Sequence, residues 1–214
     1  MKTTERQIVL VGFLQAQNCT TIPAAWRHPE ARHDVTNVGF YQDIAKILER
    51  GFFDLGFFDD RLAMPDMYGG DHRHTVEHGI RCVKLDAVTV LTTMGMATEK
   101  LGLGATYSTT YFPPFHIARV FSTLDHMTGG RAAWNVVTSV NDNEARNMGL
   151  PQAPAHDVRY DRADEFMEVV HGHWDTWEAD AVIADRTTGL YAQGDKVHRL
   201  DHKGDHYSSR AVSY

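Results

Sequence analysis

The 214-residue sequence has little cysteine, no excess of positive charge and no long apolar run. Only Cys19 and Cys82 are present, which argues against a disulfide scaffold and favours a reducing cytoplasm. The formal net charge of −7 gives no basic surface for nucleic acid or for an anionic membrane, so neither is an expected partner. The apolar run from Ile8 to Leu14 is far shorter than the ~20 residues that cross a bilayer, and no small-residue cleavage site follows it. We therefore expect neither a membrane span nor a signal peptide.

The composition that remains is that of an ordinary globular protein, with 43% hydrophobic and 23% charged residues. Short apolar runs alternate with amphipathic stretches along the chain. The predicted strands are Gln7–Leu14, Phe52–Phe58, Leu101–Tyr111 and the run that begins at Arg131. The predicted helices lie within residues 36–51, 85–102, 113–130 and 157–177. Thr36 is expected to cap the first helix and Gly51 to end it, whereas residues 61–84 are expected to form a polar loop.

Apolar strands that alternate with helices predict an α/β fold in which both faces of a parallel sheet are covered. A doubly wound sheet would close within this length, but neither G-x-G-x-x-G nor G-x-x-x-x-G-K-[ST] occurs. A (β/α)8 TIM barrel also fits, although it needs ~250 residues. Four strand–helix units would then make about half of a barrel.

Polar side chains end several of the predicted strands or follow them closely. They are Asp60, the run Thr106–Thr110, and Thr138 with Ser139. Because ligands bind at the carboxyl ends of parallel strands, these residues could converge on one rim. Polar surface loops would give the same list by chance, and the pattern alone leaves both interpretations open.

The segment ARVFSTLDHMTGGRAAWNVVTSVNDNEARNMG, residues 118–149, carries a specific resemblance. Further matching segments occur in order, namely WRHPEA, ERGFFDLGFFDD, GATYSTTYFPPFHIAR, HDVRYDRADEF and KVHRLDHKGDHY. Together they resemble the flavin-dependent monooxygenases of the bacterial luciferase-like superfamily, in the branch that contains nitrilotriacetate monooxygenase component A. The resemblance covers the N-terminal portion of that family.

The resemblance implies a (β/α)8 barrel domain that is truncated to about its first half. Strand–helix units would occupy residues 1–178, and an irregular, insertion-like segment would occupy residues 179–214. The implied cofactor is FMN, bound in its reduced form at the carboxyl ends of the strands. The cofactor contacts carried over by position are Asp60, Thr106, Ser139, His156 and Tyr160. Asn135 is expected to orient the loop after its strand, and no catalytic acid or base is assigned.

The implied activity is a monooxygenase reaction in the cytoplasm. A separate flavin reductase would supply reduced FMN, and dioxygen would oxygenate a small organic substrate, in some relatives with cleavage of a C–N or C–S bond. A homo-oligomer is expected. Two alternatives stay open: a deazaflavin-dependent oxidoreductase of the same fold, and an inactive fragment that only associates with another chain, because the family continues beyond the HKGDHY segment.

A histidine-rich run, DHRHTVEHGIRC, suggests a further candidate. His74, His78 and Cys82 have i, i+4 spacing, which would suit the zinc site of a metal-dependent hydrolase. The run matches no standard structural zinc pattern, so a solvated histidine-rich loop is the competing interpretation. The predicted metal content is none.

Overall fold

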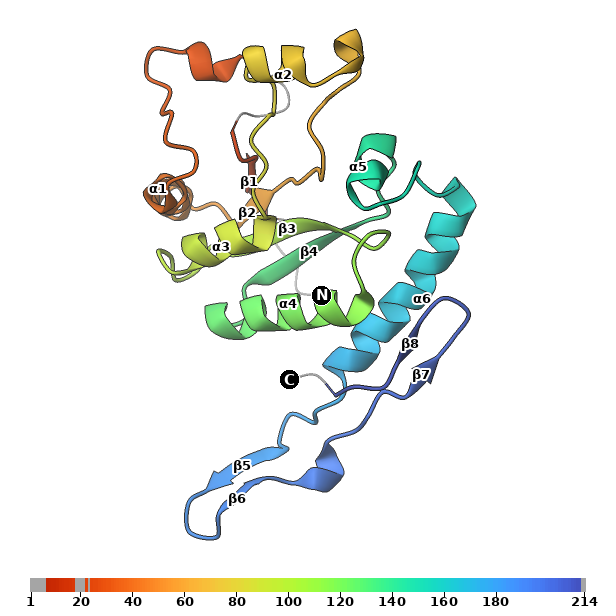
Figure 1. The fold of residues 1–214 in the computed structure, drawn as a ribbon. Helices are drawn as coiled ribbons and strands as arrows, with labels where there is room; N and C mark the ends of the chain where they lie inside the picture. Colours follow the sequence, from red (N-terminus) through yellow and green to blue (C-terminus); the bar gives the residue numbers. More distant parts are fainter. Residues whose placement is uncertain (1–6, 18–21, 23, 213–214) are drawn as a thin grey trace, which may run out of the picture.

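The computed structural model describes residues 7–17, 22 and 24–212, with a four-stranded parallel sheet at its centre (Figure 1). The strands are β1 (Val11–Leu14), β2 (Leu55–Phe58), β3 (Gly102–Ser108) and β4 (Ala132–Val137), and each pairs in parallel with the next along the chain. The predicted parallel sheet is therefore confirmed. Because every strand runs the same way, all the carboxyl ends meet at one rim.

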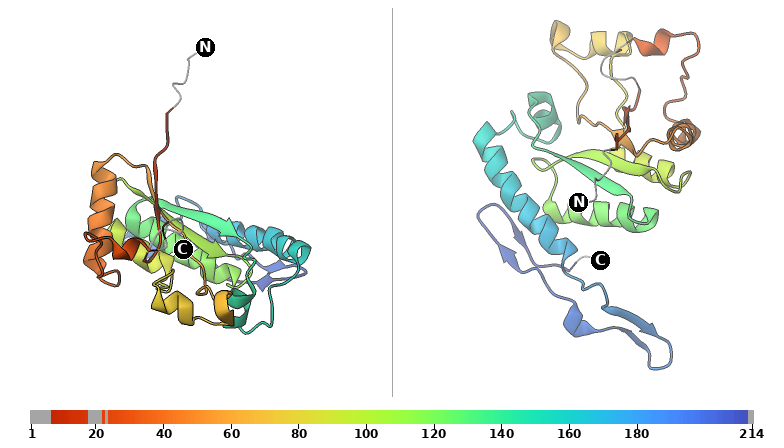
Figure 2. Two further views of the ribbon diagram at one scale, coloured as in Figure 1. Left: turned by 90° about the horizontal axis from the view of Figure 1, so that it is seen from above. Right: turned by 180° about the vertical axis from the view of Figure 1, so that it is seen from behind.

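Helices connect the strands and cover one face of the sheet (Figures 1 and 2). The longer ones are α1 (Val38–Arg50), α3 (Ala87–Gly95), α4 (Pro114–Thr128) and α6 (His156–Trp174). α1 packs against α3, α3 against α4, and α4 against α6. The shorter elements are α2 (Arg73–Glu77), α5 (Asp142–Asn147) and the 3-10 turns η1 (Ala25–Arg27), η2 (Tyr68–Gly70) and η3 (Gly194–Lys196).

Local signals placed most helix ends well, with one error at α1. The side chain of Asn37, not of Thr36, caps the helix by accepting a hydrogen bond from the Gly39 amide at 2.8 Å. Asparagine and threonine are both good caps, and the extended backbone of Asn37 decides between them. Gly51 does follow the end of α1, but the left-handed φ of 59° belongs to Phe52. Within the predicted loop at residues 61–84, the structure has η2 and α2.

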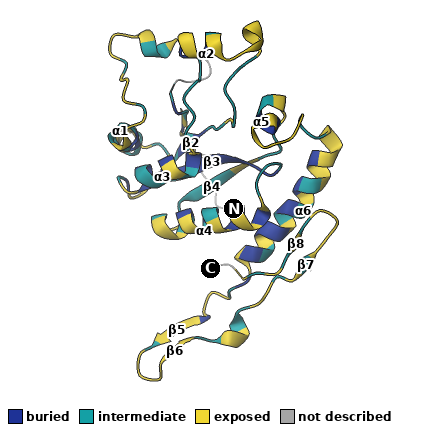
Figure 3. Ribbon diagram, viewed as in Figure 1, coloured by how far each residue is buried: buried dark blue, intermediate teal, exposed yellow. Residues whose placement is uncertain are grey.

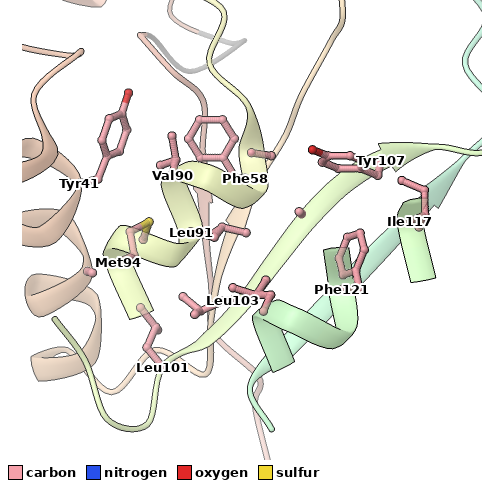
Figure 4. Packing of buried hydrophobic residues seen from close by; sticks show 14 of the residues in the cluster. Tyr41, Phe58, Val90, Leu91, Met94, Leu101, Leu103, Tyr107, Ile117 and Phe121 are labelled. Carbon is pink, nitrogen blue, oxygen red and sulfur yellow. The ribbon is translucent and has the colours of Figure 1, made fainter. Parts of the chain in front are cut away.

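The hydrophobic core lies between the sheet and the helices (Figure 4). Leu91 and Met94 of α3 are fully buried, as are Leu103 of β3 and Ile117 of α4. On the same face of the sheet, a Cβ built at Gly12 would approach a Leu48 side-chain carbon to 2.7 Å. Glycine in β1 therefore lets α1 lie close to the sheet.

The two edge strands are more exposed than their apolar sequences predict. β4, drawn mainly in teal in Figure 3, is only partly buried. Val11 and Phe13 of β1 are 45% and 47% exposed, and Val136 of β4 is 41% exposed. Val11 and Phe13 alternate with Gly12, so they point away from the helices. β4 pairs only with β3 within the described residues, which leaves its other side open. The prediction that both faces of the sheet are covered was wrong for these two strands, because helices pack on one face only.

One arginine, Arg131, links the amino-terminal ends of β3 and β4 to the carboxyl-terminal ends of α3 and α4. The guanidinium of Arg131 donates to the carbonyls of Thr128, Leu101 and Gly95 at 2.7, 2.9 and 3.0 Å, and to both Oγ1 and the carbonyl of Thr98. Five donor contacts in one plane suit the fixed fork of arginine and no other side chain. This cluster fixes β4 relative to α3.

The C-terminal part forms two antiparallel hairpins, β5 (Val182–Asp185) with β6 (Leu190–Ala192), and β7 (His202–Lys203) with β8 (Ser208–Ser209). The β5–β6 hairpin extends away from the sheet, whereas β7–β8 lies along α6 (Figures 1 and 2). Glu165 of α6 accepts hydrogen bonds from His202 Nε2 at 3.0 Å and from the amides of His206 and Tyr207 at 2.8 Å. These bonds hold the pKa of Glu165 at about 2, although its burial works against them.

None of the helices within residues 7–17, 22 and 24–212 combines the length and apolar character that crossing a bilayer requires.

Candidate functional site

A cavity of about 510 Å³ opens at the carboxyl ends of the strands. Four of the five predicted contact residues line it, namely Asp60, Thr106, Ser139 and Tyr160. They follow β2, lie in β3, follow β4 and lie in α6, so residues 100 positions apart in sequence meet at one rim. The structure therefore favours the shared rim over unrelated surface loops.

The loop after β4 holds Ser139 in an unusual conformation. Its φ is 48°, in the left-handed region that residues other than glycine seldom adopt. Ser139 Oγ donates to Ser108 Oγ at 2.9 Å, and the Ser139 carbonyl accepts a hydrogen bond from the Arg159 guanidinium. The neighbouring Thr138 carbonyl accepts from the Thr110 hydroxyl. Three bonds from two other elements therefore fix this loop at the cavity wall before any ligand binds.

Thr106 is fixed by a direct contact between neighbouring strands. It pairs with Asn135 in the sheet register, and the Asn135 amide Nδ2 lies 3.2 Å from Thr106 Oγ1. Asn135 is part of β4 and also lines the cavity, so it orients Thr106 rather than the following loop. Thr106 is only 6% exposed, and it lines both the 510 Å³ cavity and a smaller adjoining one.

Asp60 lies at the centre of the rim and lines three adjoining cavities. Burial raises the pKa of its carboxyl to about 6, and the positive charge of Lys84 opposes that rise. The negative charges of Asp86 and Asp59 add to it. Asp59 is engaged separately, because its carboxylate accepts a hydrogen bond from Gln15 Nε2 at 2.6 Å. Asp60 can therefore change from hydrogen-bond donor to acceptor near pH 6.

Two predicted residues belong to the first turns of α6. Tyr160 borders the cavity and is 51% exposed. His156 does not line the cavity; its ring lies 4.7 Å from that of Tyr160, and its Nδ1 is 2.9 Å from an Asp157 oxygen. The N-cap residue Ala155 makes no side-chain capping bond, so the first amides of this 19-residue helix keep their donors.

Sequence patterns missed two buried groups at the rim. Glu144 of α5 is 4% exposed, accepts hydrogen bonds from the Leu62 amide at 3.1 Å and Asn141 Nδ2 at 3.2 Å, and lines the cavity. The Tyr107 hydroxyl donates to the Asp86 carboxylate, and burial together with that bond raises the tyrosine pKa. α5 has only six residues, so no periodic pattern could reveal it. Strand alternation, which puts Tyr107 on the opposite face from Thr106, was the available signal for the second group.

The histidine-rich run does not bring its three candidate ligands together. The rings of His74 and His78 lie 4.1 Å apart, and His78 Nδ1 contacts the His74 carbonyl at 3.0 Å. Cys82 instead donates its thiol hydrogen to Gln17 Oε1 at 3.3 Å. Across the described part of the chain, no group of three histidine, cysteine or acidic residues is placed to hold a metal ion. The other cysteine, Cys19, lies outside the described residues.

The sequence is similar to those of several known monooxygenases. Among curated proteins, the chain is 50% identical over 204 residues to dibenzothiophene-sulfone monooxygenase of Rhodococcus erythropolis, covering 95% of this chain and 45% of the relative. It is 40% identical over 211 residues to N-acetyl-S-(2-succino)cysteine monooxygenase of Bacillus subtilis, covering 98% of this chain and 45% of the relative. The chain thus spans just under half the length of these relatives.

Solved structures give the same result for the fold. The crystal structure of a long-chain alkane monooxygenase matches with a TM-score of 0.90 and 35% identity, covering 98% of this chain and 49% of that one. A riboflavin lyase crystallised with modified FMN and riboflavin also matches with a TM-score of 0.90 and 35% identity, covering 98% and 47%. The four strands and their helices therefore represent about half of a TIM-barrel fold.

The family model for luciferase-like monooxygenases matches residues 25–213, which include all of the predicted contact residues. The chain belongs to the luciferase-like monooxygenase family.

Proposed function

We propose that this chain supplies the flavin-binding rim of an FMN-dependent monooxygenase that oxygenates a small organic substrate. The observation that carries the proposal is the single cavity lined by Asp60, Thr106, Ser139 and Tyr160 at the carboxyl ends of the strands. Cofactor sites in parallel α/β folds lie at this end of the sheet. A volume of about 510 Å³ is within the usual range for a cofactor or drug-sized ligand.

The donor and acceptor groups of the cavity fit a flavin. Thr106 and Ser139 offer hydroxyls that can donate or accept, and Asp60 offers a carboxyl whose pKa is about 6. Arg159, whose guanidinium donates to the Ser139 carbonyl, is buried beside this wall, and its Nε has no hydrogen-bond partner within the described residues. The N-terminus of α6, next to Tyr160, favours a phosphate group by its dipole and its free amides.

Each side chain then has a distinct role. Thr106, held by Asn135, and Ser139, held by Ser108 and Arg159, would orient the ring system without moving themselves. Asp60 would accept a hydrogen bond above pH 6, where it is ionised. Bound reduced FMN supplies the reaction with dioxygen, and the protein's part is to position the ring and exclude water.

The partners follow from this chemistry. A separate flavin reductase would deliver reduced FMN, dioxygen would be the second substrate, and the reaction would take place in the cytoplasm. The relatives support a small organic substrate, since one is a dibenzothiophene-sulfone monooxygenase and another an N-acetyl-S-(2-succino)cysteine monooxygenase.

An anaerobic titration tests the proposal. The purified chain is titrated with dithionite-reduced FMN, and flavin absorbance and fluorescence report saturation. We expect Ser139→Ala to weaken binding by about three- to tenfold, because one hydrogen bond is worth about 1 kcal/mol. Ser208→Ala, on the distant β8 strand, removes the same hydroxyl and should leave the affinity unchanged. Equal losses in both variants, or no saturable binding by a folded wild-type chain, would contradict the proposal.

A further inference from the structure

A narrow slot adjoins the main cavity, and three cations line it. Arg61, Arg81 and Lys84 border the slot, together with the ends of β1 and β2. Asp59, Asp60 and Arg61 line both the slot and the 510 Å³ cavity, so a ligand in the cavity can reach the slot directly. The free space of about 10 Å³ admits one small polar group rather than a ring.

The donors of these cations are not used by the protein. Among residues 7–17, 22 and 24–212, the side chains of Arg61, Arg81 and Lys84 form no ion pair and donate no hydrogen bond. Lys84 is half-buried, and burial lowers its pKa, with the charges of Arg81 and Arg61 acting in the same direction and Asp60 and Asp59 against it. A half-buried ammonium with no acceptor is costly, and such groups normally have a partner.

The slot is also held in place rather than formed by mobile side chains alone. Gln17, just after β1, accepts hydrogen bonds through Oε1 from the Cys82 thiol at 3.3 Å and the Val83 amide at 3.4 Å. These bonds attach the segment between Arg81 and Lys84 to the chain that follows β1. Arg81 has a φ of 51°, an uncommon conformation for a side chain of this size.

The charges do not cancel within the slot. Three cations face two carboxylates, and one of these, Asp59, already accepts a hydrogen bond from Gln15. The slot therefore keeps at least one positive charge in excess. Arginine and lysine donors directed at one point are the usual means of binding a carboxylate or a sulfur oxyanion.

We propose that this slot binds an oxyanion substituent of the substrate, a carboxylate, sulfinate or sulfonate, while the remainder of the substrate lies in the main cavity. The inference rests on the proposed function, because it takes the main cavity as the reaction site. Such a slot would select anionic organic molecules over neutral ones of the same shape.

The phosphate of FMN has the same chemistry and is the competing source of an oxyanion. No residue of α6 lines the slot, whereas the phosphate is proposed to bind at the N-terminus of that helix. The two sources are separated by comparing reduced FMN with reduced riboflavin, which lacks the phosphate.

The experiment is calorimetric titration of the purified chain with benzenesulfonate and with phenyl methyl sulfone, its neutral counterpart, at low ionic strength. We expect the wild-type chain to bind the sulfonate at least about tenfold more tightly, a difference of about 1.4 kcal/mol. Arg81→Gln and Lys84→Gln should each remove most of that preference. Arg186→Gln changes the same charge on the exposed turn between β5 and β6, and should keep it.

The outcomes separate the two proposals. Equal affinity for the sulfonate and the sulfone in the wild-type chain would overturn the proposal for the slot, even if reduced FMN still binds. A loss of sulfonate preference in Arg186→Gln as large as that in Arg81→Gln would overturn it too. Weaker binding of reduced FMN but not of reduced riboflavin in Arg81→Gln would assign the slot to the phosphate of FMN, and this too would overturn the proposal that the slot binds the substrate. Sulfonate preference without any binding of reduced FMN would support the slot and contradict the proposed function. Arg61→Gln, at an exposed position, repeats the test should a half-buried variant fail to fold.

Discussion

Replacing Asp60 with asparagine should make the chain more stable at neutral pH. Burial raises the carboxyl pKa from 3.8 to about 6, so the folded state disfavours the ionised form. At about 1.36 kcal/mol per unit of pKa, the cost of ionised Asp60 is about 3 kcal/mol, an upper value because Asp60 keeps some contact with water. The neutral amide of Asp60→Asn avoids this cost.

The effect has a definite pH dependence. Below pH 3.8 the Asp60 carboxyl is neutral in the folded and the unfolded chain, so it does not change the free energy of unfolding. Between pH 3.8 and about 6 the unfolded chain ionises first, and the free energy of unfolding falls as the pH rises. Above pH 6 the full cost of burying the ionised carboxylate is present. Urea unfolding should therefore show Asp60→Asn more stable by about 2–3 kcal/mol at pH 7.5 and by only about 0.5 kcal/mol at pH 4.

A matched control is Asp161→Asn, which removes an exposed carboxylate on α6 and should change stability little at either pH. The reasoning is refuted if Asp60→Asn is no more stable than wild type at pH 7.5, because Lys84 would then offset the whole cost of burial. If Asp60 also contacts the cofactor, the same variant should bind reduced FMN less tightly, so stability and binding would change in opposite directions.

Three further predictions concern parts of the fold that support the rim. Arg131→Lys should lower the free energy of unfolding by about 2–3 kcal/mol in urea titrations, since an ammonium cannot replace five planar donor contacts. The pKa of Glu165, at about 2, lies below its ordinary 4.5, so its contribution is complete above pH 4.5 and is lost as the pH falls towards 2. The protection factor of the Tyr207 amide, which is corrected for the slower intrinsic exchange at low pH, should therefore fall in that range, and an unchanged protection factor would contradict this view. Gly204→Ala should loosen the β7–β8 hairpin, because its Cβ would collide with Glu165, whereas Gly194→Ala, with open space around it, should not; equal melting temperatures would refute the steric argument.

Much of the architecture could be predicted because each signal was local. Apolar runs of four to seven residues and helical periodicity identified the four strands of the parallel sheet and the four long helices, but not the strands of the two C-terminal hairpins. The rim followed from topology alone, since parallel strands must bring Asp60, Thr106 and Ser139 to one end. The helix predicted within residues 113–130 ends at Gly129, whose φ of 67° is one that glycine adopts without strain.

What the sequence could not predict depends on neighbours that are distant along the chain. The exposure of Phe13 and Val136 depends on which strand sides are open, and apolar composition carries no information about that. Glu144 is buried only because the loop at Leu62 comes back over α5. Arg61 lies 20 or more positions before Arg81 and Lys84, and a polar run offers no pattern that would group Arg61 with the other two cations of the slot.

The central claim is that the carboxyl-end rim of this sheet binds reduced flavin, and hydrogen exchange tests its location most directly. The purified chain is exchanged under anaerobic conditions with and without reduced FMN, and peptides are compared by mass. The account predicts slower exchange in residues 138–141 and in the first turns of α6, with no change in the β5–β6 hairpin. Saturating flavin that leaves the rim unprotected, or that protects only residues away from it, would contradict the account.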